Sequence, residues 1–225
     1  MHLRLIPLAA LLALAAGSLS AGLSPLPPGA GDSHERRVYR FERQELTVPD
    51  IESPGYILDI GGGGEGVIGQ IRPRQVIAID ISRRELEGAP AGPLKIVMDA
   101  RDLKFLDNTF PVATSFFTLM YINEGDHLKV FQEIRRVLAP GGRFLVWDVV
   151  LPKQLEKGKD IAAFPFLFHL PGGKEVQTGY GVHWPPSLHD LAYYVRLAEK
   201  AGFRVVKRSE AGRTFYLELR KPGAP

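Results

Sequence analysis

Short apolar runs alternate with helical or loop-like stretches from Tyr56 to the end of the chain. The runs are too short for typical helices and rich in β-branched and aromatic residues, which predicts strands. Their continuous apolarity is typical of strands covered on both faces of a sheet. The predicted strands are 56–60, 76–81, 94–97, 112–120 and 143–150. Pro111 is expected at the first residue of the fourth strand, because proline cannot donate to a ladder.

Two segments have the pattern of helices. The helix predicted over 126–138 ends at the sequence APGG and carries one apolar face, formed by Leu128, Phe131, Ile134 and Leu138. A second helix is predicted from Ser187, which can cap its N-terminus with Asp190 three residues later, to Ala201, where Gly202 closes it.

Strands that alternate with crossover helices predict an α/β fold with a mostly parallel, doubly wound sheet. Two closing runs, 203–207 and the alternating 213–220, are expected to bring in an antiparallel edge strand. With them the predicted sheet has seven strands.

The segment 161–186 has no helical period and mixes five aromatic residues and two histidines with glycine and proline. Long irregular segments in compact domains are usually lids or binding loops, so we expect a lid or acceptor-binding segment at about 151–186. A packed connection that only fills the core is the alternative.

The N-terminus has the layout of a targeting segment. Residues 1–22 contain one arginine, then an apolar run, then small residues, which predicts a secretory signal peptide or, if uncleaved, a membrane anchor. A mis-assigned start codon is the alternative and would leave the protein cytoplasmic. Residues 23–35 are a Pro/Gly-rich linker, and one folded domain is expected over 36–225.

Composition narrows the classes of function. The 225 residues are 45% hydrophobic and 24% charged with a formal charge of +3, which is typical of a globular protein. The basic run 34–43 is interpreted as a solvated face, so no nucleic-acid partner is expected. There is no cysteine, which excludes disulfides, thiolate metal sites and a cysteine nucleophile.

A bare glycine run follows the first strand. The stretch YILDIGGGGEGVIG (56–69) lets a ligand lie against main-chain atoms with no Cβ in the way. Ligands of open α/β sheets bind at the carboxyl ends of strands, where such a turn leads into a helix. Gly61, Gly63 and Gly66 also fit the dinucleotide pattern G-x-G-x-x-G, which alone is a weak signal.

Acidic residues bear on the choice between a dinucleotide and S-adenosylmethionine. Glu65 would repel a pyrophosphate at the helix N-terminus, whereas S-adenosylmethionine carries a sulfonium and an ammonium that acids attract. Glu65 could equally be a favourable N-terminal charge on the helix. Asp80 and Asp99 end successive strands, where a carboxylate can accept ribose hydroxyls or an adenine amino group. Either could instead cap a turn.

Four stretches between about residues 55 and 150 resemble, in order, the class I S-adenosylmethionine-dependent methyltransferases, in particular their small-molecule, type 11-like branch. They are ILDIGGGGEG, AIDIS, MDARDLKFLDNTFP and VLAPGGRFLVWD. The resemblance implies a Rossmann-like fold and S-adenosylmethionine as the cofactor. It also implies which residues bind the cofactor. Asp59, Gly61, Gly62 and Gly63 would hold the methionine end, and Asp80, followed by Ile81, would contact the ribose. Asp99 and Ala100 would contact the adenine.

The chain departs from the family pattern in two places. The family usually has acid-x-Gly-x-Gly-x-Gly, but Glu65 stands at the third glycine and Gly66 follows, so the loop is expected to be reshaped. The fourth strand lacks the acid that the family usually has near its start. Beyond residue 150 the resemblance thins.

Methyl transfer needs alignment of the acceptor with the methyl group, and carbon or hydroxyl acceptors usually need a base. No catalytic residue is assigned. The candidates for a base are Tyr121, Glu124, His127, His169, Tyr180, His183 and His189. No metal site is expected, because no acid pattern completes a ligand set with the histidines.

These observations predict a methyltransferase that acts on a small, partly apolar acceptor, with membrane contact only through an uncleaved 1–22 segment. A nicotinamide-dependent oxidoreductase is one alternative, but it would need a second region for hydride transfer. A non-catalytic, exported cofactor-binding module is the other, favoured by the signal-like N-terminus.

Overall fold

The computed structural model describes residues 36–223, and these form two compact units. The smaller unit contains residues 152–186 and the described chain up to Val48, and the larger unit contains the rest. The single domain expected over 36–225 stays a prediction. The targeting segment predicted at 1–22 and the linker at 23–35 lie outside the described residues. Within residues 36–223, no helix is long and apolar enough to cross a membrane.

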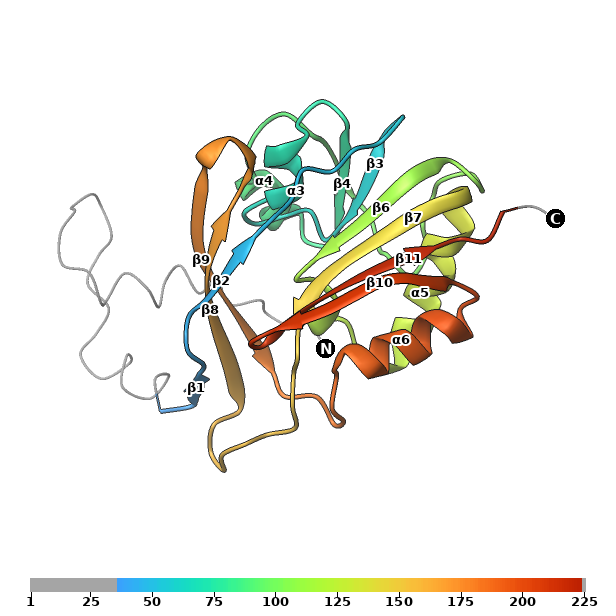
Figure 1. Cartoon of the computed structure of the whole chain (residues 1–225). Coiled ribbons are helices and arrows are strands. Elements are labelled where there is room, and N and C mark those ends of the chain that lie inside the picture. The colour runs from blue at the N-terminus through green and yellow to red at the C-terminus, as the bar shows by residue number, and fades with distance from the viewer. Residues whose placement is uncertain (1–35, 224–225) are drawn as a thin grey trace. The chain divides into compact units, whose positions relative to one another are not determined.

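A seven-stranded sheet forms the centre of the larger unit, with the strand order β10-β11-β7-β6-β3-β4-β5 (Figure 1). Its strands are β3 (Ile57–Ile60), β4 (Val76–Asp80), β5 (Leu94–Val97), β6 (Phe110–Phe116), β7 (Leu138–Val149), β10 (Arg204–Ala211) and β11 (Thr214–Arg220). Neighbours from β5 to β7 pair in parallel, and β11 is antiparallel to both β7 and β10. The predicted α/β class and mostly parallel sheet are confirmed, and the antiparallel strand lies just inside the edge strand β10.

Helices cover both faces of this sheet. The helices α5 (His127–Val137) and α6 (Leu191–Lys200) pack with Leu58 and Ile60 of β3 in the main apolar cluster. Successive side chains of a strand point to opposite faces, so Ile57 and Asp59 lie on the other side. The short helices α3 (Val67–Ile71) and α4 (Arg83–Gly88) connect β3, β4 and β5, and their buried residues are outside the α5–α6 cluster.

Most predicted boundaries agree with the structure to within a few residues, and the differences have local causes. Strand β6 ends at Phe116 rather than residue 120, because the short 3-10 helices η1 (Leu119–Tyr121) and η2 (Glu124–Asp126) follow it. Pro111 is the second residue of β6, not the first, and lies at a register shift against β7, where a missing N–H is tolerated.

The N-cap predicted for the last helix was wrong. Helix α6 begins after Asp190, whose side chain accepts a hydrogen bond from the Tyr193 N–H at 2.7 Å. Ser187 lies before the helix and donates instead to Glu124, with its Oγ 2.8 Å from Oε2. Both serine and aspartate are good N-caps, so residue type alone could not separate them.

The irregular segment predicted at 161–186 is largely a β-hairpin in the smaller unit. Strands β8 (Ile161–His169) and β9 (Glu175–His183) pair antiparallel and are joined through the 3-10 turn η3 (Pro171–Gly173). Parallel partners β1 (Val38–Arg40) and β2 (Gln44–Thr47) lie one after the other along β8. Strand β1 lies within the basic run, so that run is not only a solvated face.

Pro165 explains why the hairpin was missed. Proline argues against a central strand, because it removes a ladder hydrogen bond. In β8, however, the β1 ladder ends at Ala163 and the β2 ladder begins at Phe166. Pro165 lies in the gap between these two ladders.

Candidate functional site

The glycine run forms a tight turn at the carboxyl end of β3, as predicted. Gly61 has a φ of +72°, and a Cβ there would lie 2.3 Å from the Thr118 side chain at the end of β6. A Cβ on Gly63 would lie 2.6 Å from the Glu85 Cβ in α4. These glycines therefore let the main chain pass close to neighbouring elements, and their conformation is required by the fold itself.

Asp59 lies beneath this turn and is 2% exposed. Its Oδ1 accepts a hydrogen bond from Thr114 Oγ1 at 2.7 Å. A Cβ on Gly62 would lie 2.7 Å from Asp59 Oδ2, so this oxygen faces the bare glycine Cα. Burial raises the pKa of Asp59 to about 7, against the Thr114 hydrogen bond, and the charge of Asp80 adds to the rise. Its predicted contact with the methionine end stays a prediction.

Asp80 ends β4 and connects the glycine turn to α4. Its carboxylate accepts hydrogen bonds from the N–H of Ser82, at 2.7 Å, and from the N–H of Gly63. Burial raises the pKa of Asp80, and these two hydrogen bonds oppose the rise. A carboxylate has about four lone-pair sites, so further hydroxyl donors can still be accepted. The next residue in the sequence, Ile81, is 65% exposed.

Asp99 follows β5 and is paired with Arg101. The Arg101 guanidinium and backbone N–H both donate to the carboxylate, which lowers the pKa of Asp99. Arg101 also donates to Asp126 Oδ2 at 2.9 Å, just before α5. Ala100 packs against the main apolar cluster. The predicted adenine contact of Asp99 would have to share a carboxylate that Arg101 already binds.

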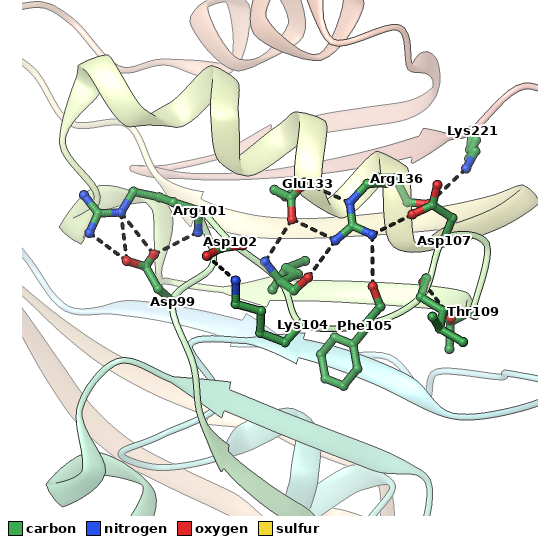
Figure 2. A network of polar contacts seen from close by, with 12 residues as sticks. Asp99, Arg101, Asp102, Lys104, Phe105, Asp107, Thr109, Glu133, Arg136 and Lys221 are labelled. Carbon is green, nitrogen blue, oxygen red and sulfur yellow. Dashed lines mark hydrogen bonds and ion pairs between the residues drawn. The ribbon is translucent and has the colours of Figure 1, made fainter.

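The connection from β5 to β6 has no helix and is held by side chains of α5 (Figure 2). Arg136 donates to the carbonyl oxygens of Leu103, at 2.6 Å, and Phe105, at 2.9 Å, and pairs with Asp107. Glu133 accepts from the Leu103 N–H at 2.9 Å. These contacts fix the segment that begins with Asp99.

Carboxylates dominate the charge around the glycine turn. Burial raises the pKa of Glu85 in α4, and the charges of Asp80 and Glu65 add to that rise, whereas Arg84 opposes it. The helix after the turn, α3, has only five residues and starts at Gly66 without a side-chain cap. A short helix contributes little dipole to hold a pyrophosphate, and the acids would repel one. The arrangement suits a ligand with positive charge.

A second polar cluster lies beyond the carboxyl ends of β6 and β7 in the same unit. It contains three of the candidates for a base, Glu124, His127 and His189, the last of which lies just before α6. Glu124 Oε2 lies 2.8 Å from Ser187 Oγ and 3.2 Å from His189 Nε2. The candidates His169, Tyr180 and His183 belong instead to the hairpin of the smaller unit.

Sequence reasoning missed Tyr193 and Asp148. The Tyr193 hydroxyl lies 2.8 Å from His127 Nδ1, and its ring stacks on His189 with centroids 4.6 Å apart. Asp148 in β7 is fully buried and accepts from the N–H groups of Met120 and Val149. The acid in VWDVV, inside an otherwise apolar strand, was a signal that could have identified Asp148.

The methyltransferase-domain family matches residues 58–146 of this chain. The chain is 34% identical over 120 residues to a sterol 4-C-methyltransferase of Caenorhabditis elegans. The matched region covers 53% of this chain and 32% of that protein. It is 30% identical over 148 residues to a ubiquinone/menaquinone biosynthesis C-methyltransferase of Pseudomonas entomophila, covering 60% of this chain and 57% of that protein. The chain thus spans 32% and 57% of the length of these two relatives.

The fold is also that of solved methyltransferases. The structure of a SAM-dependent methyltransferase from Methanosarcina mazei has a TM-score of 0.55 with this chain at 18% identity, covering 78% of this chain and 96% of that one. Residues 58–146 thus match the methyltransferase-domain family and the fold is that of class I S-adenosylmethionine-dependent methyltransferases, which confirms the resemblance read from the four motifs. The cofactor of this family is S-adenosylmethionine, not a dinucleotide.

Proposed function

We propose that this protein is a methyltransferase that transfers a methyl group from S-adenosylmethionine to a small, partly apolar acceptor. One observation carries the proposal: a glycine turn and two strand-end acids, Asp80 and Asp99, lie at the carboxyl ends of the adjacent strands β3, β4 and β5. This is where ligands of open α/β sheets bind. When bound, S-adenosylmethionine supplies an electrophilic methyl group on a positively charged sulfur.

The residues present fit this cofactor by their chemistry. The turn is most open at Gly64, where a Cβ would meet only Glu85 Oε2 at 3.5 Å, and a methionine tail would lie against the main chain there. Asp80 has acceptor sites for ribose hydroxyls, and the exposed Ile81 offers an apolar contact. Asp99 with Ala100 would meet the adenine. Asp59 would hold the turn from beneath, and the surrounding acids would attract the positive charges of the ligand.

An apolar acceptor is supported by the relatives. Their names assign sterols to one protein and ubiquinone or menaquinone biosynthesis to another, and both names refer to carbon methylation. The acceptor atom of this chain is not specified by these names. We infer an organic small molecule as the partner and no nucleic acid.

Calorimetric titration tests the cofactor directly. The full chain should bind S-adenosylmethionine and its demethylated product, and NADH should give no heat of binding. Binding of NADH alone would make the protein a reductase. If no nucleotide ligand binds, the non-catalytic module becomes the better description.

We also propose that residues 1–22 direct export or anchor the protein to a membrane, since their sequence has the layout of a targeting segment. Fractionation of cells that express the full chain or a chain beginning at residue 23 tests this. Equal amounts of both chains in the cytoplasm would favour a mis-assigned start codon.

A further inference from the structure

The carboxylate of Glu124 is held in one orientation by two hydrogen-bond donors. Ser187 Oγ donates to Oε2 at 2.8 Å, and His189 Nε2 lies 3.2 Å from the same oxygen. An ionised carboxylate can only accept hydrogen bonds, so Nε2 of His189 must carry a proton and donate a hydrogen bond to Glu124. These bonds lower the pKa of Glu124, with the Ser187 hydrogen bond as the largest cause. The group is therefore ionised at neutral pH.

The second oxygen of Glu124 is available. Among the hydrogen bonds of residues 36–223, both that reach this carboxylate end on Oε2, and none ends on Oε1. The side chain is 35% exposed, whereas the His189 side chain that orients it is 3% exposed. A buried residue thus positions a carboxylate that remains partly open.

The cationic partners open to Glu124 within the cluster are histidines only. His189 Nδ1 is buried with no hydrogen-bond partner. Burial also lowers the pKa of His127, whose Nε2 lies 3.0 Å from the Leu119 carbonyl oxygen. No lysine or arginine among the described residues forms an ion pair with Glu124. The cluster offers a negative charge that no lysine or arginine of residues 36–223 compensates.

The cluster lies at the edge of the sheet that carries the glycine turn. Glu124 follows β6, and Leu151, which follows β7, forms a β-bridge with His189. Strand β6 lies directly beside β3, which carries the glycine turn. The carboxyl ends of parallel neighbours meet at one edge of the sheet, so Glu124 and the cofactor residues share that edge.

We propose that Glu124 binds the methyl acceptor by accepting a hydrogen bond from a hydroxyl or protonated amine, and that Ser187 and His189 are its positioning residues. This rests on the proposed function. A carboxylate that stays ionised is a weak base, so its task is to hold the donor group and orient the acceptor, not to remove a proton. The stacked ring of Tyr193 adds an apolar wall next to His189.

Three small probes of similar size test this proposal: phenol and benzylammonium, which donate hydrogen bonds, and toluene, which does not. Each is titrated into the full chain, with and without S-adenosylhomocysteine, and followed by NMR of the histidine ring signals. We expect at least fivefold tighter binding of phenol or benzylammonium than of toluene. Tighter binding of phenol identifies a hydroxyl acceptor, and tighter binding of benzylammonium identifies an amine.

The substitution Glu124→Gln removes the charge and keeps an oxygen for Ser187 and His189. It should abolish the fivefold preference while toluene binding stays unchanged. Ser187→Ala should reduce the preference about two- to threefold. Glu87→Gln, which removes an exposed carboxylate of α4, is the matched control and should change nothing.

Equal binding of all three probes to the unmodified chain, or a preference that survives in Glu124→Gln, would overturn the proposal. A failure of the proposed function is detected separately: calorimetry would then show that the unmodified chain does not bind S-adenosylhomocysteine. The probe titration without that ligand still reports on Glu124 in such a case.

Discussion

Arg101 binds both carboxylate oxygens of Asp99, with Nε 3.0 Å from each of them and Nη2 2.7 Å from Oδ2. The same guanidinium reaches Asp126, so one side chain ties the segment after β5 to the start of α5. The acid expected to meet the adenine is therefore not free, and its direction is set by Arg101, which lies in the motif MDARDLKFLDNTFP but had no role assigned to it.

Arg101→Met should weaken S-adenosylhomocysteine binding by about three- to tenfold, or roughly 1 kcal/mol, because Asp99 loses its fixed orientation. The measurement is calorimetric titration of Arg101→Met, Asp99→Ala and the double variant. If Arg101 acts through Asp99, the two effects are not additive. Fully additive losses would show that Arg101 has a separate role.

Asp80→Ala should weaken cofactor binding more strongly. Each lost hydrogen bond to the carboxylate is worth roughly 1.5–3 kcal/mol, which predicts at least a tenfold loss of affinity. Since Asp80 also accepts from Gly63 and Ser82, the variant should unfold at a lower temperature too. Asp80→Asn keeps one acceptor oxygen and serves as the milder comparison. Unchanged affinity in both variants would exclude the ribose assignment.

Gly61→Ala should destabilise the larger unit, whether or not a ligand is present. The new Cβ would lie 2.3 Å from two atoms of Thr118, and the φ of +72° is unfavourable for alanine. We expect a loss of about 2 kcal/mol or more in urea unfolding. Thr118→Gly in the same chain should restore part of it, because the clash is removed and only the backbone strain remains. A stable Gly61→Ala chain with no cofactor affinity would instead assign this glycine to the ligand.

Asp148 should make stability fall as the pH rises. Burial raises the pKa of Asp148 from 3.8 to about 7, against hydrogen bonds from Val149, Met120 and Leu119. Between these two pH values the folded chain keeps a proton on Asp148 that the unfolded chain has released. The free energy of unfolding therefore falls as the pH rises from about 4 to about 7, and Asp148 causes no further change above that range. Unfolding of Asp148→Asn from pH 4.5 to 8 should show a shallower decline than the unmodified chain. A constant difference at every pH would contradict this.

Arg136→Ala should release the connection from β5 to β6. The substitution removes hydrogen bonds to two carbonyl oxygens and ion pairs with Glu133 and Asp107, and we expect a loss of about 2–4 kcal/mol. Hydrogen exchange at Leu103 should increase, because its N–H is held by Glu133. Arg83→Ala, which breaks an exposed pair with Glu87, is the control and should leave the unfolding midpoint unchanged. Equal effects of both variants would show that the network contributes no more than a surface ion pair.

The sequence predicted the elements whose signal is local. Runs rich in apolar residues identified β3 and β4, which are largely buried, and also β5, although Leu94 and Val97 are exposed at the edge of the sheet. The hairpin was missed because Pro165 lies among Phe164, Phe166 and Phe168, and a proline argues against a strand unless a gap such as the one between the β1 and β2 ladders accommodates it. Alternation of large apolar residues was nevertheless a usable strand signal there.

Long-range pairing is the part of the site that local patterns do not encode. The motifs brought Asp80 and Asp99 to the right strand ends, but the bond between Ser187 and Glu124 joins residues 63 apart in sequence. Such contacts depend on where β7 and α6 place the chain after the sheet has formed. Ser187 therefore read as a helix cap, and Glu124 as one candidate among several.

The order in which the chain is synthesised has a consequence for the smaller unit. Val38 of β1 pairs with Ile161 of β8, and β2 pairs with the second half of the same strand. Both early strands thus emerge from the ribosome well before their partner exists, and the whole of the cofactor-binding sequence between them is made first. When a nascent chain that is truncated before residue 161 is released, we expect residues 38–47 to be sensitive to protease. Protection of these residues should begin only in chains long enough to contain the whole of β8.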